Sequence, residues 1–293
     1  MKRRLQAAAA LLAILQLGAC SAATTDQFAI FSKAGTTLAD STPPLLDAAF
    51  AEAVKTDTVV LTVARDSLPD KNERLKALDD SDKLLQQRVE IFADLKRHSQ
   101  LLRNYFVTLG NLADTSGDSA LGDSAKGIVD ELGVIHPKLA EASIGGIAVS
   151  SLVQTAVPVA VGVFRSVALE SELKARATTI ASEIDLEKAV LMVISEAMQH
   201  DVKARMEQED FTNIVKPFVN PGPLPSDWNT KRLASLQRPT AIEAVDAAAR
   251  AADNLRQSFV ALTEGGSGAS LALLVADVSR VASLVEQLKP AKS

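Results

Sequence analysis

The chain has 293 residues, of which 31 are basic and 36 acidic, so its formal net charge is −5 at pH 7. This acidic balance disfavours nucleic acid and anionic lipid surfaces as partners. Hydrophobic residues make up 47% of the chain but aromatic residues only 4%, which favours close-packed helices built from Ala, Leu and Val over sheets. We therefore expect an all-α protein with a substantial core.

The beginning of the chain has the layout of a secretory signal peptide. Lys2, Arg3 and Arg4 precede an apolar run from Ala7 to Leu17. This run is about ten residues long, whereas a helix that spans a bilayer needs about twenty. We expect residues 1–19 to be removed after export, which takes away three basic residues and no acidic one and leaves a mature charge of −8.

Leu17, Gly18, Ala19 and Cys20 resemble the lipobox of bacterial lipoproteins, in which an aliphatic and two small residues precede a cysteine. The resemblance implies diacylglyceryl transfer to the Cys20 thiol, cleavage before Cys20 and acylation of the new amino terminus, which together give a stable membrane anchor. Ser21 stands where aspartate would be the inner-membrane retention signal, so the resemblance favours the outer membrane. The alternative is an ordinary signal peptide that is cleaved near Ala19.

Cys20 is the only cysteine of the chain. The mature body therefore has no cysteine for a disulfide or a metal site. After it, residues 20–41 are small and polar apart from Phe28, Ile30 and Phe31, which predicts a lipidated tether with at most one helical turn. A flexible tether of this length spans about 25 Å. We expect a helical bundle domain to occupy residues 42–293.

Two helices are predicted in the first part of this domain. The first opens at Ser41–Pro44 with a capping residue and prolines and ends at about Asp66. It includes the β-branched run Thr58–Val63, because no second strand-like run could pair with it. A regular apolar spacing from Leu75 to Leu112 predicts one amphipathic helix of about forty residues, suited to coiled-coil packing.

The next helix is predicted to end at about Ile135, because His136 and Pro137 follow. Residues 144–164 then carry no formal charge over twenty-one positions. This length permits either a helix enclosed by the bundle or a membrane span. The many glycine, serine and threonine residues make the run only moderately hydrophobic and favour burial.

A charged amphipathic helix is predicted from Arg165 to about Glu209, bent near Pro158. Residues 216–228 carry four prolines and are expected to form an extended excursion, so the domain could be subdivided near residues 210–238.

The last part of the chain has two apolar stripes, in residues 239–263 and 270–288, joined by a glycine-rich linker. Two amphipathic helices with so short a connection pack side by side in opposite directions. We therefore predict a C-terminal helical hairpin. Together these elements predict an elongated helical bundle.

No catalytic, cofactor-binding or metal-ligating residue is predicted. His98, His136 and His200 belong to different predicted elements, and Glu196 with His200 resembles an ordinary surface pair. Two loops partly resemble ligand-binding motifs but lack residues that those motifs require. Asp114, Ser116 and Asp118 alternate as in a calcium loop but without its Gly and Glu, and the cluster Gly265–Gly268 lacks the Lys-Ser/Thr ending of a phosphate-binding loop.

One local feature is a candidate partner contact. Trp228, the only tryptophan, follows a proline-rich segment that contains Leu224, and extended proline-rich segments with an aromatic residue serve as recognition elements. The alternative is that Trp228 only pins this excursion onto the bundle.

The body has a general resemblance to uncharacterised helical lipoproteins of Gram-negative bacteria, which implies no known activity. We expect a periplasmic scaffold, adaptor or accessory binding protein without catalytic activity or cofactor. It would be held at the membrane through Cys20 and would bind an envelope protein. The alternative is a membrane-active protein that inserts residues 144–164 into a bilayer as part of a pore or secretion assembly.

Overall fold

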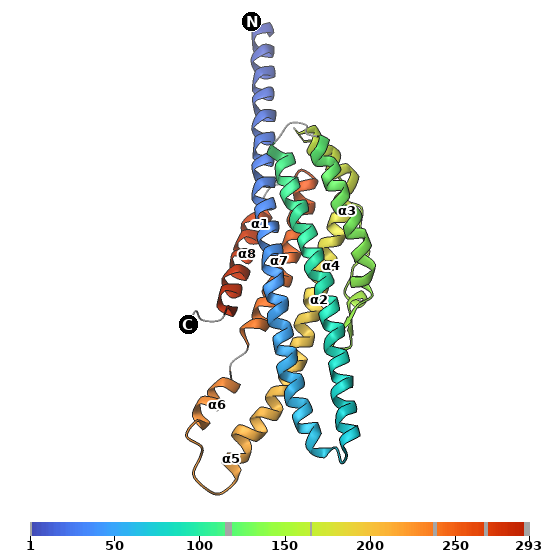
Figure 1. The fold of residues 1–293 in the computed structure, drawn as a ribbon. Coiled ribbons are helices and arrows are strands. Elements are labelled where there is room, and N and C mark those ends of the chain that lie inside the picture. The colour runs from blue at the N-terminus through green and yellow to red at the C-terminus, as the bar shows by residue number, and fades with distance from the viewer. Residues whose placement is uncertain (1, 115–118, 165, 237–238, 267–268, 290–293) are drawn as a thin grey trace.

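The structure is a computed structural model that describes residues 2–114, 119–164, 166–236, 239–266 and 269–289, with side chains from Asp26 onward except at 119 and 269. It is an elongated bundle of long helices (Figure 1). In the described residues the only sheet is a two-stranded hairpin, so the predicted all-α class is confirmed.

Six long helices build the described part of the bundle: α1 Lys2–Ser67, α2 Lys71–Asp114, α3 Ser119–Ala140, α4 Val167–Asp210, α7 Thr240–Thr263 and α8 Ala269–Leu288. Shorter elements connect them: β1 Ser143–Ile144, β2 Ile147–Ala148, the 3-10 helix η1 Val149–Ser151, the π-helix η2 Phe211–Val215, α5 Lys216–Val219 and α6 Trp228–Ser235. Helices α7 and α8 pack against each other as the predicted C-terminal hairpin.

The tether expected at residues 20–41 is wrong, because these residues belong to α1. The side chains of Phe28 and Phe31 are fully buried. The ring of Phe28 lies 5.7 Å from that of Phe164, and the ring of Phe31 lies 5.7 Å from that of Phe106. Burying each phenylalanine contributes about 1.5–3 kcal/mol, which offsets the cost of ordering the small polar residues between them. The bundle therefore begins near Phe28.

Helix α1 also continues across Pro43 and Pro44, where the sequence predicted its start. Each proline removes one backbone donor from the helix. The helix persists because Leu38 on one side of the pair and Leu45 and Leu46 on the other are buried in the same core. Beyond the prolines, the prediction that Thr58–Val63 is helical is confirmed.

Helices α1 and α2 approach closely because glycine stands at their contact. A Cβ atom on Gly35 would lie 2.7 Å from the ring of Phe106, and one on Gly110 would lie 2.5 Å from Oγ of Ser32. In the space that remains, the Ser32 hydroxyl donates a hydrogen bond of 2.6 Å to the carbonyl oxygen of Phe106. The predicted long helix from Leu75 to Leu112 is confirmed as the main part of α2.

Helix α3 does not stop at His136 and Pro137 as predicted but runs on to Ala140. The extra turn packs on the bundle, because Leu139 is fully buried and His136 bonds to Glu183 of α4. These contacts compensate for the donor that Pro137 removes.

Residues 144–164 do not form the single helix that the sequence predicted. The interpretation as a helix enclosed by the bundle and the interpretation as a membrane-spanning helix are therefore both wrong. Gly145 and Gly146 have φ of 61° and 82°, which makes a tight turn between β1 and β2. After η1 the backbone is irregular and carries Pro158, which lies outside α4 and does not bend it. Among the described residues, no helix is both long and apolar enough to cross a membrane.

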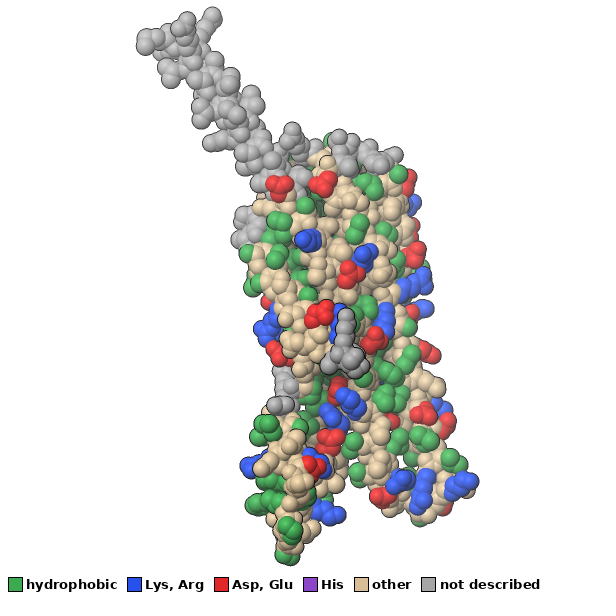
Figure 2. Space-filling model, turned by 60° about the vertical axis from the view of Figure 1, so that its left-hand side comes forward, with side chains coloured by type: hydrophobic (Ala, Val, Ile, Leu, Met, Phe, Trp, Pro, Cys, Tyr) green, Lys and Arg blue, Asp and Glu red, His purple; other side chains and the backbone are tan. Residues whose placement is uncertain are grey.

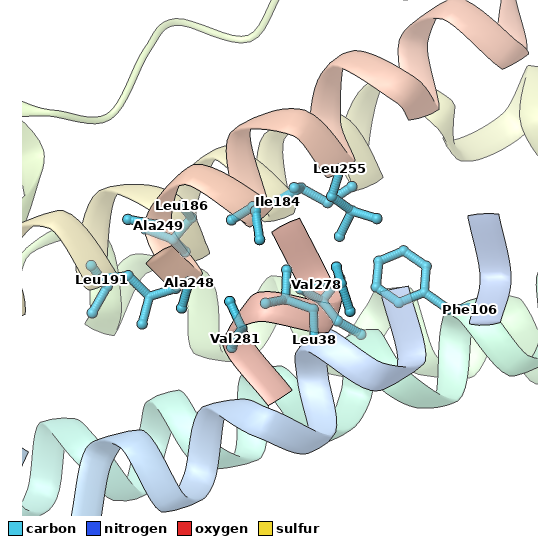
Figure 3. Packing of buried hydrophobic residues seen from close by; sticks show 14 of the residues in the cluster. Leu38, Phe106, Ile184, Leu186, Leu191, Ala248, Ala249, Leu255, Val278 and Val281 are labelled. Carbon is cyan, nitrogen blue, oxygen red and sulfur yellow. The ribbon is translucent and has the colours of Figure 1, made fainter. Parts of the chain in front are cut away.

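Helix α4 lies at the centre of the bundle and packs against α1, α2, α3 and α7. Figure 3 shows side chains from five helices meeting in one core: Leu38 of α1, Phe106 of α2, Ile184 of α4, Leu255 of α7 and Val281 of α8. The cluster is continuous and its buried members run from Phe28 to Val285. The bundle therefore has a single core, and residues 210–238 do not divide it into two domains.

The predicted excursion at residues 216–228 is extended only in part. Residues 211–219 remain helical as η2 and α5, and the chain without regular structure covers residues 220–227 before α6 begins. Residues 211–236 form a projecting arm. Figure 1 shows the arm at the end of the molecule opposite to the N-terminus, beside the turn between α1 and α2.

Candidate functional site

Four acidic side chains of α4 are buried in the bundle, namely those of Glu172, Glu183, Asp185 and Glu187. A buried carboxylate is costly unless it is paired or hydrogen-bonded. Asp185 pairs with Arg256 of α7, and Glu172 pairs with Arg176 one turn along α4.

The other two acids form a network that joins four helices. Nε2 of His98 lies 3.0 Å from Oε2 of Glu183, and Nδ1 of His136 lies 2.9 Å from Oε1 of the same carboxylate. The hydroxyls of Ser99 and Thr42 donate to Oε1 of Glu187 at 2.9 and 3.1 Å. These six residues form a buried network: Thr42, His98, Ser99, His136, Glu183 and Glu187.

The carboxylates raise the pKa of both histidines of the buried network. Burial by itself lowers the pKa of His98, but the hydrogen bonds and charges of Glu183 and Glu187 outweigh it and raise that pKa to about 9. The bond to Glu183 also raises the pKa of His136. Burial raises the pKa of Glu183, yet the two histidines outweigh it and the resulting pKa is lowered. His98 is thus an imidazolium paired with buried carboxylates at neutral pH.

The buried network can take up and release protons, but its centre is closed to a substrate, since the His98 side chain is fully buried. Among the described residues, no group of three or more His, Cys, Asp or Glu side chains could hold a metal ion. The geometry therefore supports a structural and titratable role for this cluster.

The sequence placed the three histidines on different predicted elements and indicated no contact between them. The structure brings His98 and His136 together through Glu183. His200 remains exposed on α4, as does Glu196. The missed signal was the pair Glu183 and Glu187, four residues apart among the core-facing apolar positions of α4, where a buried carboxylate needs a cationic partner.

The end of the bundle near the α1–α2 turn divides into two projections (Figure 1). One is the end of α1 with the start of α2, residues 57–84, called the hairpin tip below. The other is the arm. Where these projections leave the bundle, two ion pairs join α4 to α1 and α2. Arg205 of α4 lies 3.1 Å from Glu52 of α1, and Arg88 of α2 lies 2.5 Å from Asp201 of α4.

Trp228 holds the arm together. Its side chain is buried, and its indole Nε1 donates to the carbonyl oxygen of Ile214 at 3.1 Å. Its ring stacks on that of Phe218 at 6.0 Å, and the Arg232 guanidinium lies 5.3 Å from the ring centroid on a neighbouring turn. Of the two candidate contact residues, Trp228 is therefore internal to the arm, whereas Leu224 is 44% exposed.

The arm exposes a cluster of large apolar side chains. Phe218 and Val219 are each 67% exposed, and Leu236 is 77% exposed. Figure 2 shows green side chains gathered on this projection at the lower end of the molecule. Of the twenty-two large apolar side chains that are exposed in the described residues, twelve lie on the arm or the hairpin tip. Such clustering on a small region is typical of an interaction site.

The remaining sequence candidates lie at the edges of the described residues. Cys20 lies within α1, where side chains are outside the described part. Asp114 ends α2, while Ser116 and Asp118 lie outside the described residues. Gly265 follows α7 with φ of 80°, as expected of a linker glycine after a helix.

No protein-family model matches the chain, and no curated protein and no solved structure matches it.

Proposed function

We propose that this protein is a lipid-anchored helical scaffold or adaptor on the periplasmic face of the outer membrane, without catalytic activity, which binds another envelope protein through its arm. The observation that carries the proposal is the exposed apolar surface of the arm, formed by Phe211, Val215, Phe218, Val219, Leu224, Leu233 and Leu236.

The position of the arm supports this proposal. Cys20 precedes the first buried phenylalanine, Phe28, by eight residues. A lipid on Cys20 would therefore anchor the end of the bundle that lies opposite to the arm. About forty helical residues of α1 separate Phe28 from Ser67, which corresponds to about 60 Å. An anchored molecule would thus present its arm away from the lipid, where a protein partner is accessible.

Insertion of residues 144–164 into a bilayer has less support. Ile144, Val149 and Phe164 are buried against the bundle, and the amide of Gly162 bonds to the Thr263 carbonyl at 2.8 Å. The segment would have to lose these contacts and become helical before it could span a membrane.

The anchor is tested by Cys20→Ser, which removes the only thiol that could form the thioether. We expect accumulation of the precursor and loss of labelling by a fatty-acid analogue in cells. Ser21→Ala, a change at the neighbouring residue, serves as the control and should be processed and labelled normally. Processing and membrane retention of Cys20→Ser would contradict the anchor.

The partner surface is tested with a photoreactive amino acid placed at Phe218 or Leu236 on the arm. Leu273 on α8 is 56% exposed and provides a matched apolar control position. Irradiation of intact cells should give an adduct of one discrete mass from both arm positions and none from Leu273. An adduct of twice the chain mass would indicate self-association instead, and equal adducts from Leu273 would contradict a specific role of the arm.

A further inference from the structure

A groove lies between the last turns of α1 and the first turns of α2, within the hairpin tip. Its volume is about 290 Å³. Its walls are mostly apolar: Leu61, Leu68, Leu75, Ala77 and Leu78 line it together with Thr62, Arg65, Lys71 and Arg74. None of these residues belongs to the arm or the buried network, so the groove is independent of the proposed function.

The charged residues of the groove are all basic. The Nε atom of Arg74 donates to the carbonyl oxygen of Leu68 at 3.0 Å, which fixes its guanidinium beside the apolar wall. Arg65 lies 3.3 Å from Asp66 in an exposed pair, and such pairs are weak. Figure 2 shows several Lys and Arg side chains at the lower end of the projection that lies beside the arm.

The carboxylate of Asp70, which precedes Lys71 in the sequence, is turned toward the start of α2. Oδ1 of Asp70 accepts the backbone N–H groups of Asn72 and Glu73 at 2.6 and 3.0 Å, so this carboxylate caps the start of α2. Lys71 makes no ion pair within the described part of the chain. Apolar walls beside basic side chains are complementary to an apolar chain that carries a negative charge at one end.

We propose that this groove binds one fatty-acid molecule, with the alkyl chain against the leucines and the carboxylate at Lys71 and Arg74. The volume favours a small ligand of this chemistry. Pockets for small molecules usually enclose about 300–1,000 Å³, and a groove of about 290 Å³ lies at the lower end of this range, which suits a single medium-length acyl chain.

Photolabelling with a twelve-carbon fatty acid that carries a diazirine near its chain end tests this assignment. The full chain is reconstituted in phosphatidylcholine vesicles, labelled, digested and mapped by mass spectrometry. We expect adducts to concentrate in residues 61–78. Unlabelled laurate should compete at least tenfold better than dodecyltrimethylammonium, which has the same alkyl chain and the opposite charge. Competition should also strengthen by about twofold to fourfold per methylene from eight to twelve carbons.

Lys71→Glu is the informative variant, because an acidic residue in the first turn of α2 favours the helix and the fold is retained. It should weaken laurate competition by at least fivefold and reduce the preference for the anion. Lys126→Glu makes the same charge change at an exposed position of α3 and should leave labelling unchanged. Adducts spread evenly along the chain, equal competition by the cation, or unchanged labelling of Lys71→Glu would each overturn the assignment.

Discussion

Raising the pH from 6 to 9.5 should destabilise the bundle through His98. The raised pKa of about 9 means that the folded protein binds the imidazole proton more tightly than an unfolded chain, in which the pKa is 6.5. This contribution to stability is therefore complete below pH 6.5. It decreases as pH rises between the two values and is lost above pH 9.

The magnitude follows from the difference between the two pKa values. Each pKa unit corresponds to about 1.36 kcal/mol, so the shift of His98 from 6.5 to about 9 amounts to about 3 kcal/mol. The side chain is fully buried, so solvent screening does not reduce this value appreciably. A loss of about 3 kcal/mol is a large part of the 5–15 kcal/mol that stabilises a typical domain. The raised pKa of His136 acts in the same direction.

Urea unfolding followed by circular dichroism at several pH values between 6 and 9.5 measures this effect. His98→Leu should be less stable than the wild type at pH 6.5, because Glu187 loses its cationic partner and Glu183 keeps only His136. Removal of one partner of a buried ion pair costs about 3–5 kcal/mol. Its stability should depend much less on pH. His200→Asn changes an exposed histidine of α4 and should keep the wild-type pH dependence.

Equal losses of stability in the wild type and His98→Leu over this range, or a rise of wild-type stability with pH, would contradict the role of His98. A pH dependence that disappears in His200→Asn would also contradict it. In each of these cases another group would determine the pH dependence.

Two further predictions concern packing. Gly35→Ala should destabilise the bundle by about 1–3 kcal/mol, because the new methyl group would lie 2.7 Å from the Phe106 ring. Gly133→Ala has open space around its Cβ and should stabilise α3 by up to about 1 kcal/mol. Urea unfolding of both variants measures these changes in stability, and equal effects would contradict the close α1–α2 contact. Trp228→Ala should open the arm to limited proteolysis within residues 211–236 without a change in bundle melting temperature. The hydrogen bond, the ring stack and the cation–π contact of its indole all join residues of the arm, namely Ile214, Phe218 and Arg232. A fall in melting temperature of more than a few degrees would show that the arm supports the core.

Regular apolar spacing predicted most of the helices. In α7 and α8, and in α2 from Phe92 onward, burial follows the predicted faces. Leu75, Leu78 and Val89 of the predicted α2 stripe are instead exposed, because they lie toward the end of the bundle where α1 and α2 project. The tether prediction failed because small polar residues dominate residues 20–41, although Phe28, Phe31 and Leu38 there already have helical spacing. An apolar run without periodicity does not distinguish a helix from other buried structure. Residues 144–164 are such a run, and their irregular structure follows from the turn at Gly145 and Gly146 and from Pro158.

The candidate sites were less accessible to prediction. Glu183 stands 85 residues from His98 and 47 residues from His136, and no local pattern indicates that three helices bring these side chains together. The arm was predicted as an excursion, and the sequence identified Leu224 and Trp228 within it. It did not distinguish the internal side chain from the exposed one, because that depends on the stack between Trp228 and Phe218.

The buried acids of α4 have a consequence for the axial register of the bundle. Helices covered with Ala, Leu and Val have similar surfaces at every turn, so sliding one along its neighbours by a turn of about 5.4 Å would keep much of the apolar burial. In α4, however, Glu183 bonds to α2 and α3, Glu187 to α1 and α2, and Asp185 to α7. A slide of one turn would separate all of these partners at once and leave three carboxylates buried without them, at several kcal/mol each. Apolar packing thus assembles these helices, while the charges of α4 select a single alignment for four neighbours.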